Sequence, residues 1–294
     1  MTKLLPTLVA AILFASTSLS QGLGFELFTG LTNYQGDLRQ RFFTLQGSRP
    51  AFGLGVTYDL NSHFTLRVAA KTGTLGADDR LNKDSAIYFR NLSFQTRLTD
   101  IEGVLMCRVF SDDRTRINMY GYVGVAAFRF NPYTIDQFGI QRYLQPLGTE
   151  GQGLAGYPQA ELYGLNELAI PMGFALQYRL TPTISVAWEF AFRKTFTDYI
   201  DDVSTDYADE FDLLFGRGPV AADLSYRGDE MLVINPNVPY SMPKGAKRGN
   251  PGAKDLYYFT GLNIRYNFQG KDRGTYGGGF GGSKSRKSVE CPRW

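Results

Sequence analysis

The stretch that decides the fold is Ile170–Thr195, which reads IPMGFALQYRL, then TPT, then ISVAWEFAFRKT. Large apolar residues alternate with small or polar ones from Ile170 to Leu180, and the alternation resumes from Ile184 to Phe192. Strict period two in both arms predicts a β-hairpin, because a helix would need apolar residues at i, i+3, i+4 and i+7. One face of the hairpin carries large apolar and aromatic residues, and the other carries small, polar or charged residues. A sandwich in water would bury such a face too, so the hairpin alone leaves the surrounding solvent open.

The N-terminus has the features of a secretory signal peptide at residues 1–20. One lysine precedes an apolar run from Leu4 to Leu13, and Ser18 and Ser20 occupy the −3 and −1 positions of a cleavage before Gln21. The residue directly after the cleavage site is Gln21 rather than Cys, which argues against a lipoprotein signal. No later stretch approaches the roughly 18 apolar residues of a transmembrane helix.

The composition indicates an all-β protein. Aromatic residues make up 14% of the chain and glycines number 33, which suits strands joined by many turns. The formal net charge of +3 is too near neutral to indicate a nucleic-acid partner. A chain of 294 residues is large for one sandwich but ordinary for a small barrel with long loops.

Period-two alternation predicts eight strands along the whole chain. They are expected at Gly24–Thr32, Ala51–Leu60, Phe64–Thr72, Arg90–Phe110, Ile117–Phe130, Ile170–Leu180, Ile184–Thr195 and Leu256–Phe268. In the fourth of these, the apolar parity changes near Thr99–Asp100, which predicts a β-bulge at that point.

The connections between these strands alternate in length. Three are tight: Asn61–His63, Ser111–Arg116 and Thr181–Thr183. Four are long: Asn33–Pro50, Gly73–Phe89, Asn131–Glu167 and Thr197–Asp255. Such alternation is typical of outer-membrane barrels, whose short turns face the periplasm and whose long loops face outside. A secreted sandwich would leave it unexplained. Aromatic residues close to the tight turns fit a membrane girdle: Tyr58, Phe64, Phe110, Tyr120, Tyr178, Tyr266 and Phe268.

The predicted fold is therefore all-β, an eight-stranded antiparallel outer-membrane β-barrel with long extracellular loops. The expected division is a signal peptide at 1–20, a barrel at 21–268 and a flexible periplasmic tail at 269–294. An even strand number places both termini in the periplasm.

Charged residues fall on the inward parity of the predicted strands. They are Glu26, Arg67, Lys71, Glu102, Arg108, Arg179, Glu189, Arg193 and Arg265. Because side chains just fill a barrel of this size, this set is interpreted mainly as a lumen polar network of structural ion pairs. A path for protons or solutes is the alternative, and a pore for proteins is disfavoured.

The sequence offers little catalytic chemistry, so no catalytic residue and no cofactor are predicted. The single histidine, His63, falls in a predicted periplasmic turn, which argues against a histidine-based triad at the outer rim. An acidic loop contains Asp198, Asp201, Asp202 and Asp206, which are weak candidate calcium ligands. Their spacing matches no EF-hand, so a solvated acidic loop is the favoured interpretation. Gly148–Gly153 is glycine-rich but lacks the strand–turn–helix context of a phosphate-binding loop.

The last predicted strand is followed by 26 further residues, a glycine-rich linker with a basic end. The end carries Lys284, Arg286, Lys287, Cys291, Pro292, Arg293 and Trp294. This pattern indicates a tether that carries a partner-binding element, the alternative being a tail without a role.

Several motifs then suggest a family. NYQGDL at Asn33–Leu38, NLSF at Asn91–Phe94, TEGQG at Thr149–Gly153, RKTFTDYIDDVS at Arg193–Ser204 and the CPRW ending at Cys291–Trp294 resemble those of the PorG-like barrels. That family belongs to the type IX secretion system of Bacteroidota and includes related domains of unknown function. The resemblance implies a non-enzymatic outer-membrane component that binds a periplasmic ring of a PorK-like lipoprotein and a PorN-like partner. A stand-alone surface adhesin or ligand-binding barrel, acting through its long loops, is the alternative.

The two cysteines of the mature chain leave three pairings open. Cys107 lies near the periplasmic end of the fourth strand on the outward parity, where an unpaired thiol behaves as a small hydrophobe. A Cys107–Cys291 bond would draw the charged tail against the lipid-facing wall, at a desolvation cost. Cys291 could also remain free or bond to a partner, as an unpaired cysteine in a secreted chain suggests. The family resemblance implies the partner bond, to the ring lipoprotein.

Overall fold

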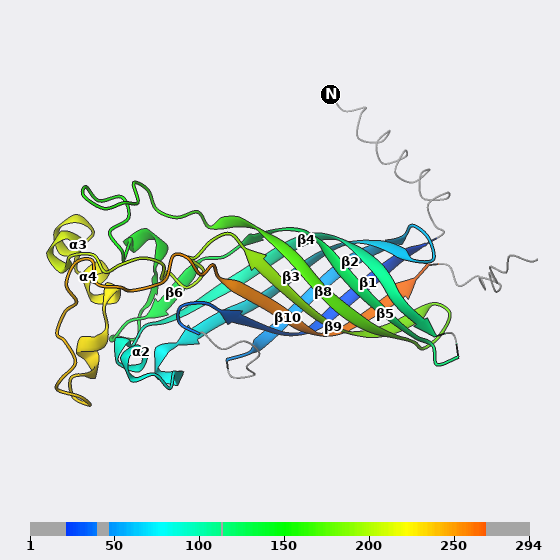
Figure 1. Ribbon diagram of the computed structural model, residues 1–294, viewed down its shortest axis with the longest axis horizontal. Coiled ribbons are helices and arrows are strands. Elements are labelled where there is room, and N and C mark those ends of the chain that lie inside the picture. Colours follow the sequence, from blue (N-terminus) through cyan, green and yellow to red (C-terminus); the bar gives the residue numbers. More distant parts are fainter. Residues whose placement is uncertain (1–21, 40–46, 113, 269–294) are drawn as a thin grey trace, which may run out of the picture.

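Eight strands form a closed antiparallel barrel in the computed structural model, which describes residues 22–39, 47–112 and 114–268 (Figure 1). The barrel strands are β1 (Leu23–Gln35), β2 (Arg49–Asp59), β3 (Phe64–Asp78), β4 (Ser93–Asp112), β5 (Ile117–Arg129), β8 (Asn166–Arg179), β9 (Ile184–Thr195) and β10 (Leu256–Asn267). Neighbours along the chain pair in order, and β10 pairs with β1 to close the ring. The predicted fold class is confirmed, and the hairpin that decided it is β8–β9.

The wall of the barrel is apolar on its outer face. On β2, Phe52, Leu54 and Val56 are exposed and the residues between them are buried. The exposed apolar residues of the wall include Phe25, Leu27, Leu31, Leu66, Val68, Ile101, Leu105, Val123, Val125, Leu168, Phe174, Leu176, Trp188, Leu262 and Ile264. A continuous apolar band around a closed barrel is the surface that lipid covers in a membrane-spanning barrel.

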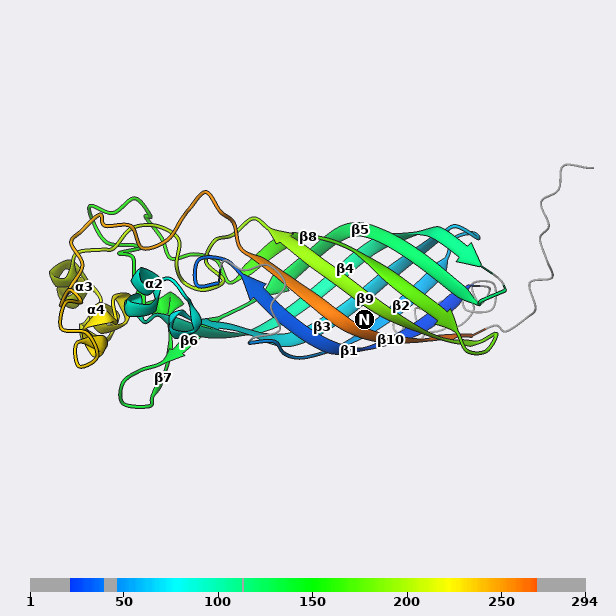
Figure 2. The ribbon, with the colours of Figure 1, turned by 60° about the horizontal axis from the view of Figure 1, so that its bottom comes forward.

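The connections separate the molecule into two ends. The turns 60–63, 114–116 and 180–183 lie at one end, with the start of β1 and the end of β10 (Figures 1 and 2). The described residues of the long connections, 36–39, 47–48, 79–92, 130–165 and 196–255, lie at the other end. We call these the short-turn end and the loop end. The predicted signal peptide and the tail from 269 onward lie outside the described residues.

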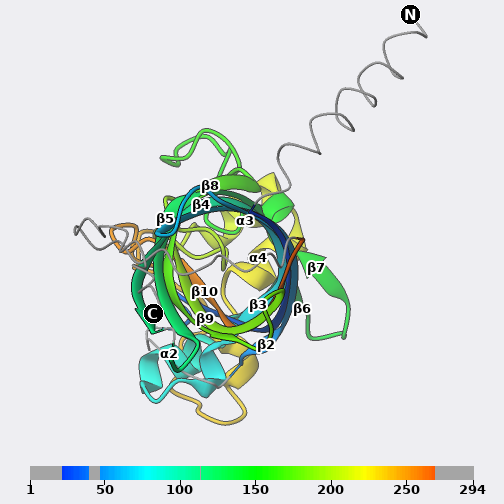
Figure 3. The same cartoon turned by 90° about the vertical axis from the view of Figure 1, so that its right-hand side faces the viewer.

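The long connections fold into a cap, which the sequence analysis did not predict. It contains the helices α2 (Ser85–Arg90), α3 (Glu210–Gly216) and α4 (Pro219–Ser225), and the 3-10 turns η1 (Asp79–Leu81), η2 (Gln145–Leu147) and η3 (Gly228–Met231). A hairpin of β6 (Pro132–Ile135) and β7 (Gln141–Tyr143) extends beyond the perimeter of the barrel (Figure 3). Asp84 and Asp209 begin α2 and α3 by accepting hydrogen bonds from backbone amides of the first turn. None of the helices in the described ranges is long and apolar enough to cross a membrane.

The predicted β-bulge near Thr99–Asp100 is wrong. Even-numbered residues of β4 point inward without interruption from Phe94 to Met106, and the register shifts only between Arg108 and Phe110. The apparent change of parity arose because Phe94 and Leu98 are apolar yet face the interior. Tyr120 corrects the predicted girdle, because it is buried in the lumen rather than placed at the rim.

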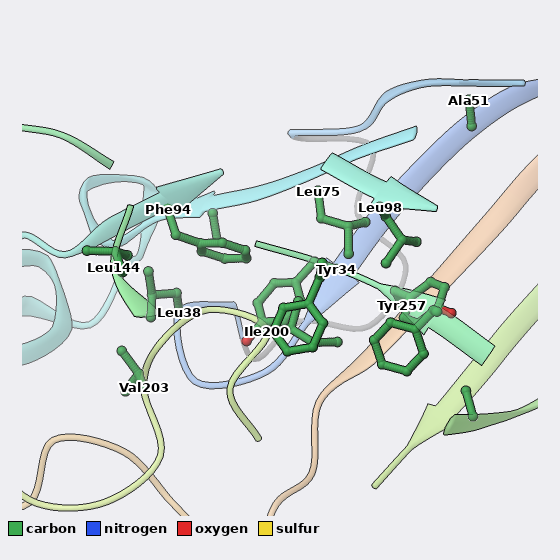
Figure 4. Packing of buried hydrophobic residues seen from close by; sticks show 14 of the residues in the cluster. Tyr34, Leu38, Ala51, Leu75, Phe94, Leu98, Leu144, Ile200, Val203 and Tyr257 are labelled. Atoms are coloured by element: carbon green, nitrogen blue, oxygen red, sulfur yellow. The ribbon is translucent and has the colours of Figure 1, made fainter. Parts of the chain in front are cut away.

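One apolar core extends from the loop-end part of the lumen into the cap. Tyr34, Leu98 and Tyr257 from the barrel strands pack in the same cluster as Ile200 and Val203 from the cap (Figure 4). Rings within it meet edge to face, as between Tyr34 and Phe94, whose centroids are 4.9 Å apart. The barrel and the cap therefore share one hydrophobic core.

Candidate functional site

The middle of the lumen holds a network of buried charges. Arg67 Nη1 lies 2.8 Å from Glu189 Oε2, and Lys71 Nζ lies 2.7 Å from Glu189 Oε1. Tyr122 and Asn263 also donate to the Glu189 carboxylate. Two cations and two neutral donors thus surround one carboxylate, as a buried charge requires.

A second carboxylate extends this network. Glu102 Oε1 forms ion pairs with Arg67 Nη2 at 2.9 Å and with Lys71 Nζ at 3.3 Å. Arg193 donates to Glu102 and lies 3.3 Å from Asp100 Oδ2. We call Arg67, Lys71, Glu102, Glu189 and Arg193 the lumen network. Asp100 and Tyr122 contact it, although the sequence analysis named neither of them as a lumen residue.

Three other predicted lumen residues lie apart from the lumen network. Arg265 Nη2 lies 2.9 Å from Asp59 Oδ1, toward the short-turn end. Arg108 bonds to the hydroxyl of Tyr120. Arg179 lies at the short-turn end of β8, where its backbone amide bonds to the Arg116 carbonyl. Glu26 Oε2 lies 3.6 Å from Arg67 Nη1, so the inward parity brought six of the nine predicted residues together and placed the other three toward the short-turn end.

Side chains leave little open space beside the network. A cavity next to Glu26 and Arg67 holds about 20 Å³, enough for a single water. Gly53 makes room for Lys71, because a Cβ at this position would lie 2.7 Å from Lys71 Cγ. The apolar core fills the part of the lumen between the lumen network and the loop end. The barrel interior therefore consists of an ionic layer, an apolar layer toward the loop end, and a smaller apolar cluster with Val104, Met106 and Tyr120 toward the short-turn end.

The predicted solvated acidic loop is wrong for three of its four residues. Asp198, Asp201 and Asp202 are buried, whereas Asp206 is exposed. Asp201 Oδ2 accepts from the hydroxyl of Tyr34 at 2.5 Å, and Asp255 Oδ1 accepts from the same hydroxyl at 2.8 Å. Asp255 also accepts a hydrogen bond from the Ile200 amide, and Asp201 accepts one from the Val203 amide. The two carboxylates therefore hold the backbone of the cap against Tyr34 of β1.

The glycine-rich Gly148–Gly153 segment packs against the same loop. Thr149 donates to Asp202 at 2.5 Å, and Glu150 accepts from the amides of Ser204 and Thr205. Arg248 pairs with Glu150 at 2.9 Å and lies 3.6 Å from Asp202. The acidic residues therefore bind protein donors. No group of three or more His, Cys, Asp or Glu side chains suited to a metal ion occurs in the described part of the chain.

Burial raises the pKa of these cap carboxyls. Desolvation lifts the pKa of Asp202 to about 6 despite the opposing effect of Arg248, and it lifts that of Asp198 to about 6 as well. Desolvation also raises the pKa of both Asp201 and Asp255, and their mutual repulsion adds to the shift of Asp255. The cap thus carries acids that titrate well above the ordinary carboxyl range.

The cap also contains a cleft of about 870 Å³, within the size range of ligand sites. Its walls come from the end of β1, from α2 and from the chain between Asn235 and Leu256. Ile87, Phe89 and Met242 supply apolar surface, and Lys247 lies at the cleft with no hydrogen bond or ion pair to the described residues. We call this the cap cleft.

The remaining predicted sites fall at the short-turn end or outside the structure. Cys107 forms no disulfide with a residue that the structure describes, and it is half-buried on the outward parity of β4, opposite Phe64 and Gly121. His63 lies in the 60–63 turn, where its Nδ1 is 2.9 Å from Ser62 Oγ. The predicted partner-binding residues Lys284, Arg286, Lys287, Cys291, Pro292, Arg293 and Trp294 lie outside the described residues.

The closed ring, the apolar outer wall and the filled lumen define an eight-stranded β-barrel of the outer-membrane class, here with a folded cap. The model of the family described as "Domain of unknown function (DUF6089)" matches residues 2–218, and the chain belongs to that family. Comparison with curated proteins gives no match.

Solved structures that resemble this chain are outer-membrane barrels of low sequence identity. Ail of Yersinia pestis, solved with the heparin analogue sucrose octasulfate, has 10% identity, with 83% of this chain and 99% of Ail covered, at a TM-score of 0.37. Neisserial surface protein A has 8% identity, 84% and 97% coverage and a TM-score of 0.41. The outer membrane protease OmpT of Escherichia coli has 8% identity, 84% and 97% coverage and a TM-score of 0.37.

Proposed function

We propose that this chain is a non-enzymatic outer-membrane anchor of the type IX protein secretion system. In this proposal it holds a periplasmic ring, formed by a PorK-like lipoprotein and a PorN-like partner, through its short-turn end and its C-terminal tail. The observation that carries the proposal is that the lumen is filled while the chain leaves the barrel at the short-turn end, just after Phe268. A filled barrel offers a fixed point in the membrane rather than a conduit.

The chemistry of the site supports a non-enzymatic role. The only histidine of the sequence, His63, lies in a short turn on the opposite side of the membrane from the cap cleft. The buried acids of the cap bind Tyr34, Thr149 and backbone amides, so their carboxylates are occupied by structural contacts. The assignment to this secretion system and the identity of the ring are inferred from the PorG-like motifs of the sequence.

Deletion of residues 269–294 tests the anchor in cells that export cargo through this system. We expect the shortened chain to insert in the outer membrane but to lose co-purification of the ring lipoprotein, with cargo retained in the periplasm. A control chain with Gly–Ser residues of equal number in place of 269–294 separates the binding element from simple length. Retention of the ring and normal export by both variants would contradict the proposal.

A second test concerns the tether itself. Membranes solubilised without reductant should give a higher-mass band that contains this chain and collapses on reduction. The band should vanish in Cys291→Ser and persist in Cys107→Ser. The opposite pattern would refute a bond between the tail and the ring.

The cap cleft favours a second candidate function, a surface barrel that binds a ligand through its loops. Its volume of about 870 Å³ and its mixture of apolar and basic walls suit a small amphipathic ligand. Filling the cleft with Ala86→Trp should then abolish surface binding while export stays normal. Under the anchor function the same variant leaves both ring retention and export intact.

A further inference from the structure

The outer wall changes chemistry abruptly at its loop end. On β4 the outward-facing residues run Leu105, Gly103, Ile101, Thr99 and then Arg97 toward the cap. On β5 they run Val123, Val125 and Ala127, and then Arg129. On both strands an exposed arginine therefore follows directly beyond the apolar band.

The two arginines are neighbours on the same surface. Thr99 of β4 pairs with Arg129 of β5, and Arg97 lies two residues further along the same face of β4. Diagonal neighbours of this kind have Cα atoms about 7–8 Å apart, within reach of two long side chains. Neither guanidinium makes an ion pair or a hydrogen bond with any residue that the structure describes. Two adjacent like charges at a membrane boundary are most stable with an anion between them.

The opposite edge of the wall has a different chemistry. The exposed residues closest to the short turns include Phe64, Phe110, Tyr178 and Tyr266, which are aromatic. The exposed arginines nearest this edge, Arg114 and Arg116, lie in the turn between β4 and β5 rather than on the face of a strand. A third exposed base, Lys194, occupies the outward parity of β9 where that strand approaches the cap.

We propose that Arg97 and Arg129 bind the phosphate group of a lipid in the membrane leaflet at the loop end. The planar guanidinium group is suited to bidentate contacts with phosphate oxygens. The apolar residues immediately below, Ile101 and Val125, would lie against the acyl chains of the same lipid. Basic residues beside a membrane surface attract anionic lipids by about 1 kcal/mol each, which corresponds to about a fivefold change in binding.

The test uses the purified full chain in detergent and two probes with identical acyl chains. Dioleoyl phosphatidic acid carries a phosphate group and dioleoyl glycerol lacks it. Native mass spectrometry then measures the fraction of protein that retains each lipid. We expect the unaltered chain to retain much more phosphatidic acid than dioleoyl glycerol. The retention of phosphatidic acid should fall about fivefold in Arg97→Gln and in Arg129→Gln. Arg114→Gln, which removes a charge at the short-turn end, should bind as the unaltered chain does.

Two further arms distinguish the source of the phosphate and the role of geometry. Inorganic phosphate in hundredfold excess should leave the bound lipid in place, and its displacement would overturn the lipid proposal in favour of a free-anion site. Arg129→Lys keeps the charge but not the planar fork, so it should retain less lipid than the unaltered chain and more than Arg129→Gln. Equal retention of both lipids, or no loss in either glutamine variant, would also overturn the proposal. Heat-dependent migration on gels verifies that each variant is a folded barrel.

Discussion

Replacement of Glu189 by Gln tests whether the lumen network determines the stability of the barrel. The change keeps the shape of the side chain but removes the charge that faces Arg67 at 2.8 Å and Lys71 at 2.7 Å. Breaking a buried ion pair on one side costs about 3–5 kcal/mol. Glu102 still contacts both cations, at 2.9 and 3.3 Å, so we expect a loss near the lower limit, about 3 kcal/mol.

The measurement is equilibrium unfolding by urea of the barrel folded into phospholipid vesicles. Glu210→Gln, on the exposed surface of α3, is the matched control and should leave the unfolding free energy unchanged. Lys71→Met in the Glu189→Gln background should recover part of the loss, because it removes one of the two cations left with too few partners. A cost below about 1 kcal/mol for Glu189→Gln would refute the view that these charges are coupled in a low-dielectric interior.

Three other predictions follow from the wall, the cap and the two ends. Phe190 is only 8% exposed although it faces outward, because the rings of its neighbours on β8 and β10 cover it, with centroids 5.9 and 5.6 Å away. Arg in its place should cost about 2–4 kcal/mol of folding free energy in bilayers and Leu about 1 kcal/mol; equal stability of the Arg and Leu variants would show that the outward assignment is wrong. The pKa of Asp202 is about 6 in the folded cap against an ordinary 3.8, so the folded cap binds more protons between these values, and its stability falls as pH rises from about 4 to about 6. Proteolysis of the cap should therefore be slower at pH 4 than at pH 7, and Asp202→Asn should reduce that difference. In a background whose native cysteines are serines, Val233→Cys should react with an impermeant maleimide on intact cells and Ser62→Cys should not, since Val233 is 96% exposed in the cap and Ser62 lies in a short turn.

The barrel strands were predictable because lipid imposes one simple rule on them. Outward residues must be apolar, so period two is visible along β2, β8 and β9 from the sequence alone. The rule fails where the interior is also apolar. Phe94 and Leu98 fill the loop-end part of the lumen, so the inner and outer faces of β4 look alike there and a bulge was predicted in the wrong place.

The cap could not be predicted by the same reasoning. Its helices are short, and its stability comes from contacts between segments far apart in the chain, such as Thr149 with Asp202 and Tyr34 with Asp201. Acidic residues in a loop ordinarily remain in water, so no local pattern indicated that Asp201 and Asp202 would be buried. One signal was present: NYQGDL, TEGQG and the Asp198–Ser204 segment are all motifs of the family resemblance, and the structure places the Asp198–Ser204 segment in contact with each of the other two.

The lumen residues illustrate an intermediate case. Parity placed Arg67, Glu102 and Glu189 inside correctly, but it carries no information on which charges meet. Which charged side chains meet depends on their positions along the barrel axis. Because the strands are tilted, these positions depend on the register of all eight strands. Arg108 and Arg265 share the inward parity yet lie too far toward the short-turn end to reach the central carboxylates.

The common core of barrel and cap imposes an order on biogenesis. Its aromatic side chains include Tyr34 of β1 and Tyr257 and Phe259 of β10, and these two strands meet only when the ring closes. Until that moment Asp255 and Asp201 lack their shared contact to Tyr34, so the segment between β9 and β10 cannot adopt its final form. A chain stalled before closure would expose this segment to quality-control proteases, whereas a finished one would not. The cap can therefore reach its final fold only after the ring has closed, although it lies at the opposite end of the barrel from the first and last barrel residues.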